Sequence, residues 1–396
     1  MSYSDDLRSG RGKEGDCYYR IFNGKAEIEH FNSEYCGTVC IPGTLGGCPV
    51  TSLGDHAFLN CVSLTSVTIP ASVTGLAVSV FEGCSSLSTI NVDLKNDIFA
   101  SLDGVLFDKN ITTLLRCPEN RTGCYKVPNS VTTIWDSAFF MCISLTSVMI
   151  GSRVTRIGES DTFSGCSNLT AIDVDKDNIF YSSVDGILFN KNQTKLLTCP
   201  LGKTGSYTSP DSVIHIGDLA FMNCSHLTSV TIGSHVFQIG NYAFAGCTSL
   251  KCANISNQVC HIGEDVFQEC VGLLAINVDS RNSVFSSVNG VLFDKRQTKL
   301  IRFPAGKGRS YVVPQGVTCI EDSAFMSCSE LKTVVLASTI AHVGELAFSN
   351  CSGLSGLFIY ADIPVECREK YVSNLGLNRE MKVYFIKKGS PVVRYV

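Results

Sequence analysis

Apolar and polar positions alternate along this chain in a pattern that repeats about every 23 residues. Nine segments read Phe-x-x-Cys-x-x-Leu and continue into a short run in which Val or Ile alternates with polar or small residues. A fixed period of this length indicates that one small unit of structure is stacked on the next, because a single unit cannot bury its apolar side alone. The pattern therefore predicts a solenoid. The nine segments begin at Phe58, Phe81, Phe139, Phe163, Phe221, Phe244, Phe267, Phe325 and Phe348.

The run after each Leu predicts one short strand per unit. In residues 64–70, Val67 and Ile69 alternate with Ser66 and Thr68. Side chains of a strand change face at every residue, so we expect Val and Ile to point into the stack and Ser and Thr to point outward. The proline that follows ends the strand, because proline donates no hydrogen bond to a sheet.

A corner precedes each Phe. The segment from the corner to the Cys has room for about one helical or 3₁₀ turn, which would aim the Phe and Cys side chains into the core. An Ile-Gly pair introduces several corners, and we expect its glycine to permit the change of direction. These glycines are Gly158, Gly217, Gly240 and Gly263. Three units carry Ala77, Trp135 and Glu321 in its place.

Three longer segments interrupt the short period, at residues 96–128, 178–210 and 282–314, and they are copies of one another. Each carries Asp-Gly or Asn-Gly between two apolar runs, beginning at Asp103, Asp185 and Asn289. This predicts a two-residue hairpin turn, because both turn positions need positive φ. Each segment ends in a strand followed by proline, so we expect each insert to return to the stack as one further coil.

The sequence divides into four predicted parts. These are a disordered leader over residues 1–16, an N-terminal cap with the first strand over 17–54, the repeats over 55–360, and a C-terminal cap over 361–396. The cap contains a predicted hairpin at Asn23-Gly24. We expect thirteen stacked strands in all. One is the cap strand at 38–41, nine belong to the short units, and three belong to the insert coils.

These residues resemble a known family. The stretch from Cys61 to Phe81, and the corner Ile-Gly-Asn-Tyr-Ala-Phe-Ala-Gly-Cys at residues 239–247, are similar to the BspA-like leucine-rich repeats, also called the Treponema pallidum type. The resemblance covers roughly residues 19–360. It implies a leucine-rich repeat solenoid with parallel β-strands stacked along one face, short helical or 3₁₀ corners, three inserts that contain β-hairpins, and few long helices. It also implies a non-enzymatic binding protein, usually secreted or exposed on a cell surface, and several members are adhesins.

Charge and composition limit the kinds of partner and the cellular location that we expect. The formal net charge is -4, so nucleic acid and anionic membranes are not expected, because such partners need a basic face. No apolar run approaches the roughly 18 residues of a membrane span. The first 16 residues lack the apolar stretch of a signal peptide, so we expect either a cytoplasmic protein or an export signal that has been removed. We expect a monomer.

The chain has 20 cysteines, nine of them at the repeat position. Stacked one per coil, their Cα atoms would be about 4.8 Å apart with parallel Cβ directions. A disulfide needs Cβ atoms about 3.8 Å apart, so we expect a ladder of buried thiols rather than bridges. Two smaller groups leave bridging open in an oxidising compartment. They are Cys36, Cys40 and Cys48, and the pair Cys117 and Cys124.

Candidate chemistry is sparse. The sequence has no G-x-S-x-G elbow, no phosphate loop and no G-x-G-x-x-G, and its seven histidines lie scattered over many units. We therefore expect no catalytic residue, no cofactor and no metal site. Two function classes stay open. In one, the outward strand residues bind a protein or glycan; in the other, the solenoid is a passive structural scaffold or spacer. The predicted binding face consists of Ser66, Thr68, Thr89, Asn91, Ser147, Met149, Asp173, Ser229, Thr231, Asn254, Asn277, Thr333 and Phe358.

Overall fold

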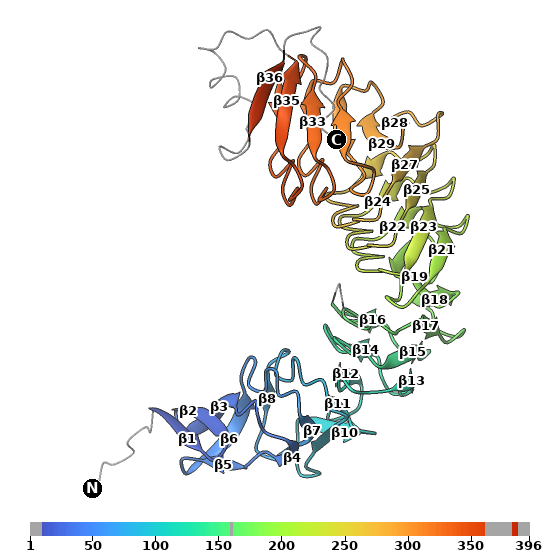
Figure 1. The fold of residues 1–396 in the computed structure, drawn as a ribbon. Coiled ribbons are helices and arrows are strands. Elements are labelled where there is room, and N and C mark those ends of the chain that lie inside the picture. The colour runs from blue at the N-terminus through green and yellow to red at the C-terminus, as the bar shows by residue number, and fades with distance from the viewer. Residues whose placement is uncertain (1–9, 159–160, 361–381, 387–396) are drawn as a thin grey trace. The chain divides into compact units, whose positions relative to one another are not determined.

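The structure is a computed structural model that describes residues 10–158, 161–360 and 382–386 (Figure 1). The chain forms two compact units, residues 1–191 with 200–202, and residues 192–199 with 203–396. Every regular element in the described ranges is a β-strand. Strands of successive coils pair in parallel, which confirms the predicted solenoid.

The coils of the first unit alternate between front strands and back strands, and several of the back strands have only two residues. The front strands form two parallel sheets, which we call front sheets 1 and 2. Sheet 1 contains β4 (Gly37–Cys40), β7 (Leu64–Ile69) and β9 (Thr89–Val92), and sheet 2 contains β13 (Gly123–Lys126), β15 (Leu145–Ile150) and β17 (Ala171–Val174). The back strands include β8 (Gly75–Leu76), β14 (Thr133–Ile134) and β16 (Arg156–Ile157). Val67 and Ile69 are fully buried, as their alternation predicts.

The second unit repeats this arrangement with four strands in each front sheet. Front sheet 3 contains β21 (Gly205–Thr208), β23 (Leu227–Thr231), β25 (Cys252–Ile255) and β27 (Ala275–Val278). Front sheet 4 contains β31 (Ser310–Val312), β33 (Thr333–Leu336), β35 (Gly356–Tyr360) and β36 (Val383–Ile386). The back strands are β20 (Lys195–Thr198), β22 (His215–Ile216), β24 (Gln238–Ile239), β26 (His261–Ile262), β30 (Lys299–Arg302), β32 (Cys319–Ile320) and β34 (His342–Val343).

The thirteen predicted stacked strands are all present, and β36 adds a fourteenth. This strand lies within the predicted C-terminal cap, residues 361–396. Strand β36 pairs in parallel with β35, with Tyr384 opposite Phe358, so the stack continues beyond residue 360. The other residues of the predicted cap lie outside the described ranges.

The N-terminal cap is a small mixed sheet. Its strands are β1 (Gly10–Glu14), β2 (Cys17–Phe22), β3 (Lys25–Phe31), β5 (Thr44–Leu45) and β6 (Cys48–Leu53). The turn between β2 and β3 is the predicted Asn23-Gly24 pair, with φ values of 49° and 69°. Strand β1 pairs with β2 along its whole length, which corrects the expectation of a disordered leader at residues 10–14. Residues 1–9 lie outside the described ranges.

The corners are chains of hydrogen-bonded turns rather than the predicted helical or 3₁₀ turns. In the first corner, the Leu59 N–H donates to the His56 carbonyl at 2.9 Å and the Cys61 N–H donates to the Phe58 carbonyl at 3.2 Å. His56 and Asn60 have positive φ, 58° and 56°. Residues in the left-handed region interrupt a right-handed helix. The Phe58 N–H donates instead to a carbonyl of the next coil at 2.9 Å.

The corner glycine is required by the close approach of one coil to another, not by a positive φ. A Cβ on Gly240 would lie 2.5 Å from the backbone nitrogen of Asp218 in the preceding coil. Trp135 and Glu321 stand at positions where the preceding coil is an insert. There the neighbouring chain runs as strand β12 (Thr113–Arg116) or β30. Gly217 also follows an insert, and a Cβ there would lie 2.8 Å from the Leu196 carbonyl oxygen. The structure gives no separate explanation for the larger side chains of Trp135 and Glu321.

Each insert begins with the predicted hairpin. Strand β10 (Phe99–Leu102) pairs antiparallel with β11 (Val105–Asp108), and Asp103 and Gly104 at the turn have φ of 50° and 76°. The equivalent hairpins are β18 (Tyr181–Val184) with β19 (Ile187–Asn190), and β28 (Phe285–Val288) with β29 (Val291–Asp294). In the first and third inserts, β12 and β30 then pair in parallel with the back strands β14 and β32. These inserts return to the stack, as predicted.

A buried asparagine attaches each insert to the preceding coil. Asn96 is fully buried. Its Nδ2 donates to the carbonyls of Pro70 at 2.9 Å and Val73 at 2.8 Å, while its Oδ1 accepts from the N–H groups of Ile98 and Phe99. The same four bonds recur in the other two inserts. We call these residues the clamp asparagines, Asn96, Asn178 and Asn282.

The repeat phenylalanines stack inside each unit. In the first unit the rings of Phe139 and Phe163 are 5.4 Å apart between centroids. In the second unit the distance from Phe221 to Phe244 is 4.8 Å. Burying one such ring contributes about 1.5–3 kcal/mol relative to leaving it exposed. This contact therefore ties consecutive coils together, as the repeat pattern predicts.

Candidate partner-binding surface

All thirteen residues of the predicted binding face lie on the front sheets. The parallel register arranges them in two columns on each sheet. In sheet 1, Ser66 lies opposite Thr89 and Thr68 lies opposite Asn91; in sheet 2, Met149 lies opposite Asp173. Sheet 3 carries Ser229, Thr231, Asn254 and Asn277, and sheet 4 carries Thr333 and Phe358. Most of them are half-buried and Asn277 is exposed.

Polar side chains on these columns bond to one another. In sheet 3, Asn254 Nδ2 donates to Thr231 Oγ1 at 3.3 Å, and Asn277 Nδ2 donates to Asn254 Oδ1 at 3.0 Å. In sheet 1, Asn91 Nδ2 donates to Ser66 Oγ at 3.3 Å. A ligand that bonds to these groups must compete with the existing bonds, and a net hydrogen bond contributes only about 0.5–1.5 kcal/mol. Each coil therefore offers a partner a weak contact.

Front sheet 4 differs from the others because its second column is apolar. The parallel register places Val312, Val335, Phe358 and Tyr384 side by side, and we call this set the apolar column. The rings of Phe358 and Tyr384 stack with centroids 5.0 Å apart and 19° between their planes. Val312 is 57% exposed and Tyr384 is 45% exposed, whereas Phe358 is half-buried and Val335 is buried. Outward apolar groups of this kind mark interaction sites more often than isolated polar ones do.

Sequence reasoning missed two sets of residues on this surface. Tyr384 was not expected because its segment was interpreted as a cap, although Val383–Ile386 has the alternation of a front strand. The insert coils also contribute to the columns, for example with Lys126, Thr208 and Val312. The strand-then-proline pattern that ends each insert could have identified these insert residues.

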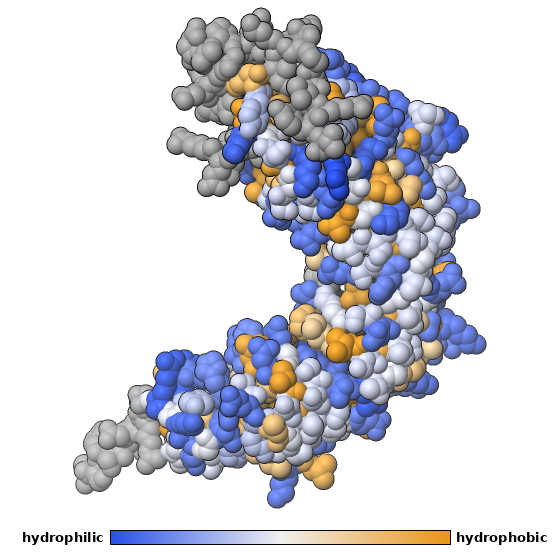
Figure 2. Space-filling model, viewed as in Figure 1, coloured by the Kyte–Doolittle hydropathy of each residue, from blue (hydrophilic) through white to orange (hydrophobic). Residues whose placement is uncertain are grey.

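Figure 2 shows that apolar residues on the visible face form small, separate areas among hydrophilic ones.

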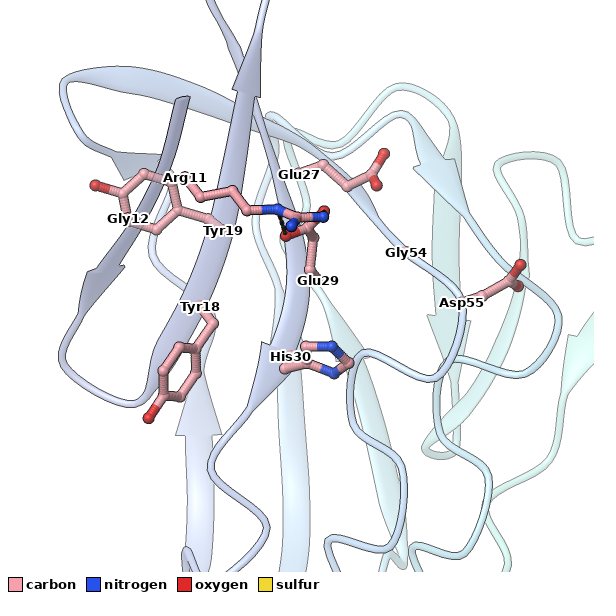
Figure 3. Close-up of a pocket in the computed structure, with 9 residues that line it drawn as sticks. All are labelled: Arg11, Gly12, Tyr18, Tyr19, Glu27, Glu29, His30, Gly54 and Asp55. Atoms are coloured by element: carbon pink, nitrogen blue, oxygen red, sulfur yellow. Dashed lines mark hydrogen bonds and ion pairs between the residues drawn. The ribbon is translucent and has the colours of Figure 1, made fainter. Parts of the chain in front are cut away.

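A cleft lies on the N-terminal cap and has a volume of about 450 Å³. It is lined by Arg11, Gly12, Tyr18, Tyr19, Glu27, Glu29, His30, Gly54 and Asp55 (Figure 3). The Arg11 side chain reaches Glu29, with Nε 2.9 Å from Oε2, and Arg20 pairs with Glu27 at 2.9 Å. These charges neutralise one another across β1, β2 and β3, and exposed ion pairs contribute about 0–1 kcal/mol each. These ion pairs in and beside the cleft link β1 and β2 to β3.

The repeat cysteines form buried ladders within each unit, as predicted. The Cys166 thiol donates to the Phe139 carbonyl at 2.9 Å, and Cys247 donates to Phe221 at 3.1 Å. Burial raises the pKa of Cys247, and it raises the pKa of Cys270 to about 12. Every cysteine in the described ranges is a thiol, including the two groups for which bridging stayed open. Cys36, Cys40 and Cys124 are exposed, whereas Cys48 and Cys117 are buried.

One buried ion pair joins the first insert to the coil before it. Arg116 Nη2 lies 2.9 Å from Glu119 Oε1, and their side chains are 6% and 3% exposed. Glu119 also accepts a hydrogen bond from the Gly83 N–H at 3.0 Å. Burial raises the pKa of Glu119, and Arg116 opposes that shift. The second insert carries Thr198 and Leu201 at these two positions and the third carries Arg302 and Ala305, so the pair is one of three packing solutions in this chain.

No group of three or more metal-ligating side chains occurs within the described residues. Among the same residues, no helix has the length and apolar character needed to cross a membrane.

The stacked front strands, the phenylalanine ladder and the Phe-x-x-Cys-x-x-Leu corners together define a leucine-rich repeat β-solenoid. A family model described as a BspA type leucine rich repeat region of 6 copies matches residues 39–118, 123–199, 201–307 and 302–364. The chain belongs to this BspA-type family, which confirms the resemblance seen in its corners. No curated protein sequence matches the chain.

Solved structures similar to this chain come from bacteria. A leucine-rich repeat protein from Eubacterium ventriosum is 22% identical, with a TM-score of 0.52, over 86% of this chain and 88% of that one. A leucine rich cell surface protein from Faecalibacterium prausnitzii is also 22% identical, with a TM-score of 0.45, over 93% of this chain and 98% of that one. A Treponema pallidum leucine rich repeat protein is 21% identical over 69% of this chain and 91% of that one, with a TM-score of 0.23. The first likeness supports the shared fold.

Proposed function

We propose that this chain is a non-enzymatic binding protein that presents its front sheets to a protein partner at the cell surface or outside the cell. Membership of the BspA-type family supports a protein-binding role of the adhesion type. The observation that carries the proposal is the apolar column of front sheet 4, where Val312 and Tyr384 stay exposed in outward positions.

The two kinds of front surface suit two tasks. The polar columns of sheets 1 to 3 offer many weak hydrogen bonds, which suit an extended partner. The apolar column offers an anchor, because aromatic side chains dominate the binding energy of protein interfaces. Both Val312 and Tyr384 are about half exposed, so covering each contributes on the order of 1 kcal/mol, roughly half of what full burial of such a side chain provides.

The test is a binding screen of the full chain against immobilised extracellular-matrix proteins and whole cells. On any partner found, Val312→Ser combined with Tyr384→Ser should weaken binding by about tenfold, which corresponds to roughly 1.4 kcal/mol. Val271→Ser is the matched control, because Val271 is 47% exposed but lies in a corner of the same unit. An unchanged affinity in the double variant, with a loss in the control, would move the site to the corners. A chain that binds nothing in the screen would favour the passive scaffold.

The polar columns have their own test. Ser147→Arg and Ser229→Arg should each reduce binding and reduce it further together, because each coil contributes a separate small contact.

A variant in an insert hairpin tests whether the inserts take part in binding, and it must leave the insert folded. Lys191 Nζ donates to the Lys176 carbonyl at 3.2 Å and also to the Asn178 carbonyl, so Lys191→Glu would disturb the insert itself. Phe180→Ala is the better probe of that insert, since Phe180 is 45% exposed.

A further inference from the structure

A small pocket lies beyond the C-terminal ends of β23, β25 and β27 of front sheet 3, on three successive turns of the second unit. Its volume is about 460 Å³, and it is lined by Ser234, His235, Phe237, Asn257, Gln258 and Arg281. We call it the edge pocket. The first three residues lie between β23 and β24, the next two between β25 and β26, and the last follows β27. The size falls in the usual range for small-molecule sites, about 300–1,000 Å³.

The edge pocket presents one positioned aromatic ring. Phe237 is 39% exposed. The His215 ring contacts it edge to face, with centroids 4.3 Å apart and 63° between the planes. The repeat does not require an aromatic residue here. The other turns carry Thr74, Thr132, Thr155, Ile214, Cys260, Thr318 and Ala341 at the same position.

Polar groups around that ring supply both donors and acceptors. The side-chain amides of Asn257 and Gln258 each carry an N–H₂ donor and a carbonyl acceptor, and the Ser234 hydroxyl can act as either. The positive charge of Arg281 is neutralised by Asp279, through bonds of 3.1 Å from Nε and 2.8 Å from Nη2. The lining therefore combines polar and apolar surface, and the guanidinium of Arg281 is paired.

These features select a class of ligand. A phosphate or carboxylate would have to compete with Asp279 for Arg281. An apolar molecule would remove water from the two amides without replacing their hydrogen bonds, which costs about 1–3 kcal/mol per group. A neutral sugar meets both demands, because its hydroxyls match the amides and its C–H face can cover an aromatic ring. We infer that the edge pocket is a binding site for a neutral glycan, with Phe237 as the stacking residue and Gln258 and Asn257 as hydrogen-bonding residues.

The test is saturation-transfer NMR on the full chain. The probes are methyl glycosides and β-linked disaccharides of glucose, galactose and N-acetylglucosamine. Neutral saccharides should bind at millimolar concentration, and Phe237→Ala or Gln258→Ala should each weaken binding by about tenfold or more. Phe180→Ala removes an equally exposed ring from an insert and should leave binding unchanged. Circular dichroism and thermal melts of all variants confirm that each remains folded.

Three results would overturn the inference. One is the absence of any saturation transfer to neutral saccharides. Another is binding that Phe237→Ala leaves intact. The last is binding limited to glucuronic or sialic acid and abolished by Arg281→Gln, which would make the pocket an anion site. Val312 and Tyr384 lie on front sheet 4, and no lining residue of the edge pocket lies on that sheet, so Val312→Ser with Tyr384→Ser should not affect saccharide binding. The two proposals can therefore fail independently.

Discussion

The clamp asparagines allow a test of how the inserts are held on the stack. Asn96→Asp keeps the size of the side chain and the two bonds accepted from Ile98 and Phe99, but it removes both Nδ2 donors. The carbonyls of Pro70 and Val73, now bonded at 2.9 and 2.8 Å, lose their partner. A buried group left without its hydrogen bond costs about 1–3 kcal/mol. We therefore expect Asn96→Asp to lower the free energy of unfolding of the first unit by about 2–6 kcal/mol at pH 7, from these two groups together.

The same variant should depend on pH in a defined direction. Burial and two facing carbonyls raise the pKa of the new carboxyl group in the folded state above its unfolded value of about 3.9. A raised folded pKa means that the folded state binds the proton more tightly. The variant should therefore be most stable below about pH 4 and lose stability as the pH rises through the folded-state pKa.

Denaturant melts at pH 4 and pH 7 measure this effect, and hydrogen exchange of residues 96–108 localises it. Asn110→Asp is the matched control, because Asn110 is exposed in the turn of the same insert. Surface changes of this kind stay within about 0.5 kcal/mol. The reasoning would be refuted by equal unfolding free energies for the two variants at pH 7, or by a clamp variant that gains stability as the pH rises.

Two further predictions concern buried groups. With iodoacetamide at pH 8, the exposed Cys36, Cys40, Cys124 and Cys260 should react first, and the buried repeat cysteines should react only after denaturation, because the stacked coils shield their thiols from the reagent. Mass mapping that found most of the repeat cysteines in disulfides would contradict this. Arg116→Thr should destabilise the first unit by about 3–5 kcal/mol, because it leaves the buried Glu119 carboxylate without its partner. Adding Glu119→Leu, which copies Thr198 and Leu201 of the second insert, should recover most of that loss in denaturant melts, and a double variant no more stable than the single one would contradict the argument.

Much of this fold was predictable because its signals are local and repeated. The alternation around Val67 and Ile69 predicted the front strands, and Asp103-Gly104 predicted a hairpin turn that the structure confirms. The corners were mispredicted for a physical reason. Their left-handed positions are occupied by residues such as His56 and Tyr242, which give no signal of positive φ, and the ladder between coils stabilises that conformation. Strand β36 was missed because the residues before it lack the Phe-x-x-Cys-x-x-Leu pattern.

The candidate sites were less predictable because periodicity reports the core. The front columns follow from the strand alternation, so the residues of the predicted face lie on the front strands, and their role in binding stays a prediction. The edge pocket combines side chains from three turns about 23 residues apart, and the repeat does not specify any of them. Phe237 could have been found by comparing equivalent positions of the repeats, since the other turns carry small or aliphatic residues there. Its contact with His215 required the coordinates.

The inserts limit how a partner can use the front sheets. Each hairpin turn reaches the edge of the last strand before it, and the Gly104 carbonyl accepts a hydrogen bond from the Ile90 N–H at 2.8 Å. The same contact recurs at Gly186 with Ile172 and at Gly290 with Ile276, both at 2.8 Å. The backbone groups that would pair with a further front strand are thereby occupied by the insert. A partner therefore meets sheets of three or four strands, each with its own side-chain columns. Affinity should then depend on how many sheets the partner contacts, and sheet 4 should contribute most because it alone carries the apolar column.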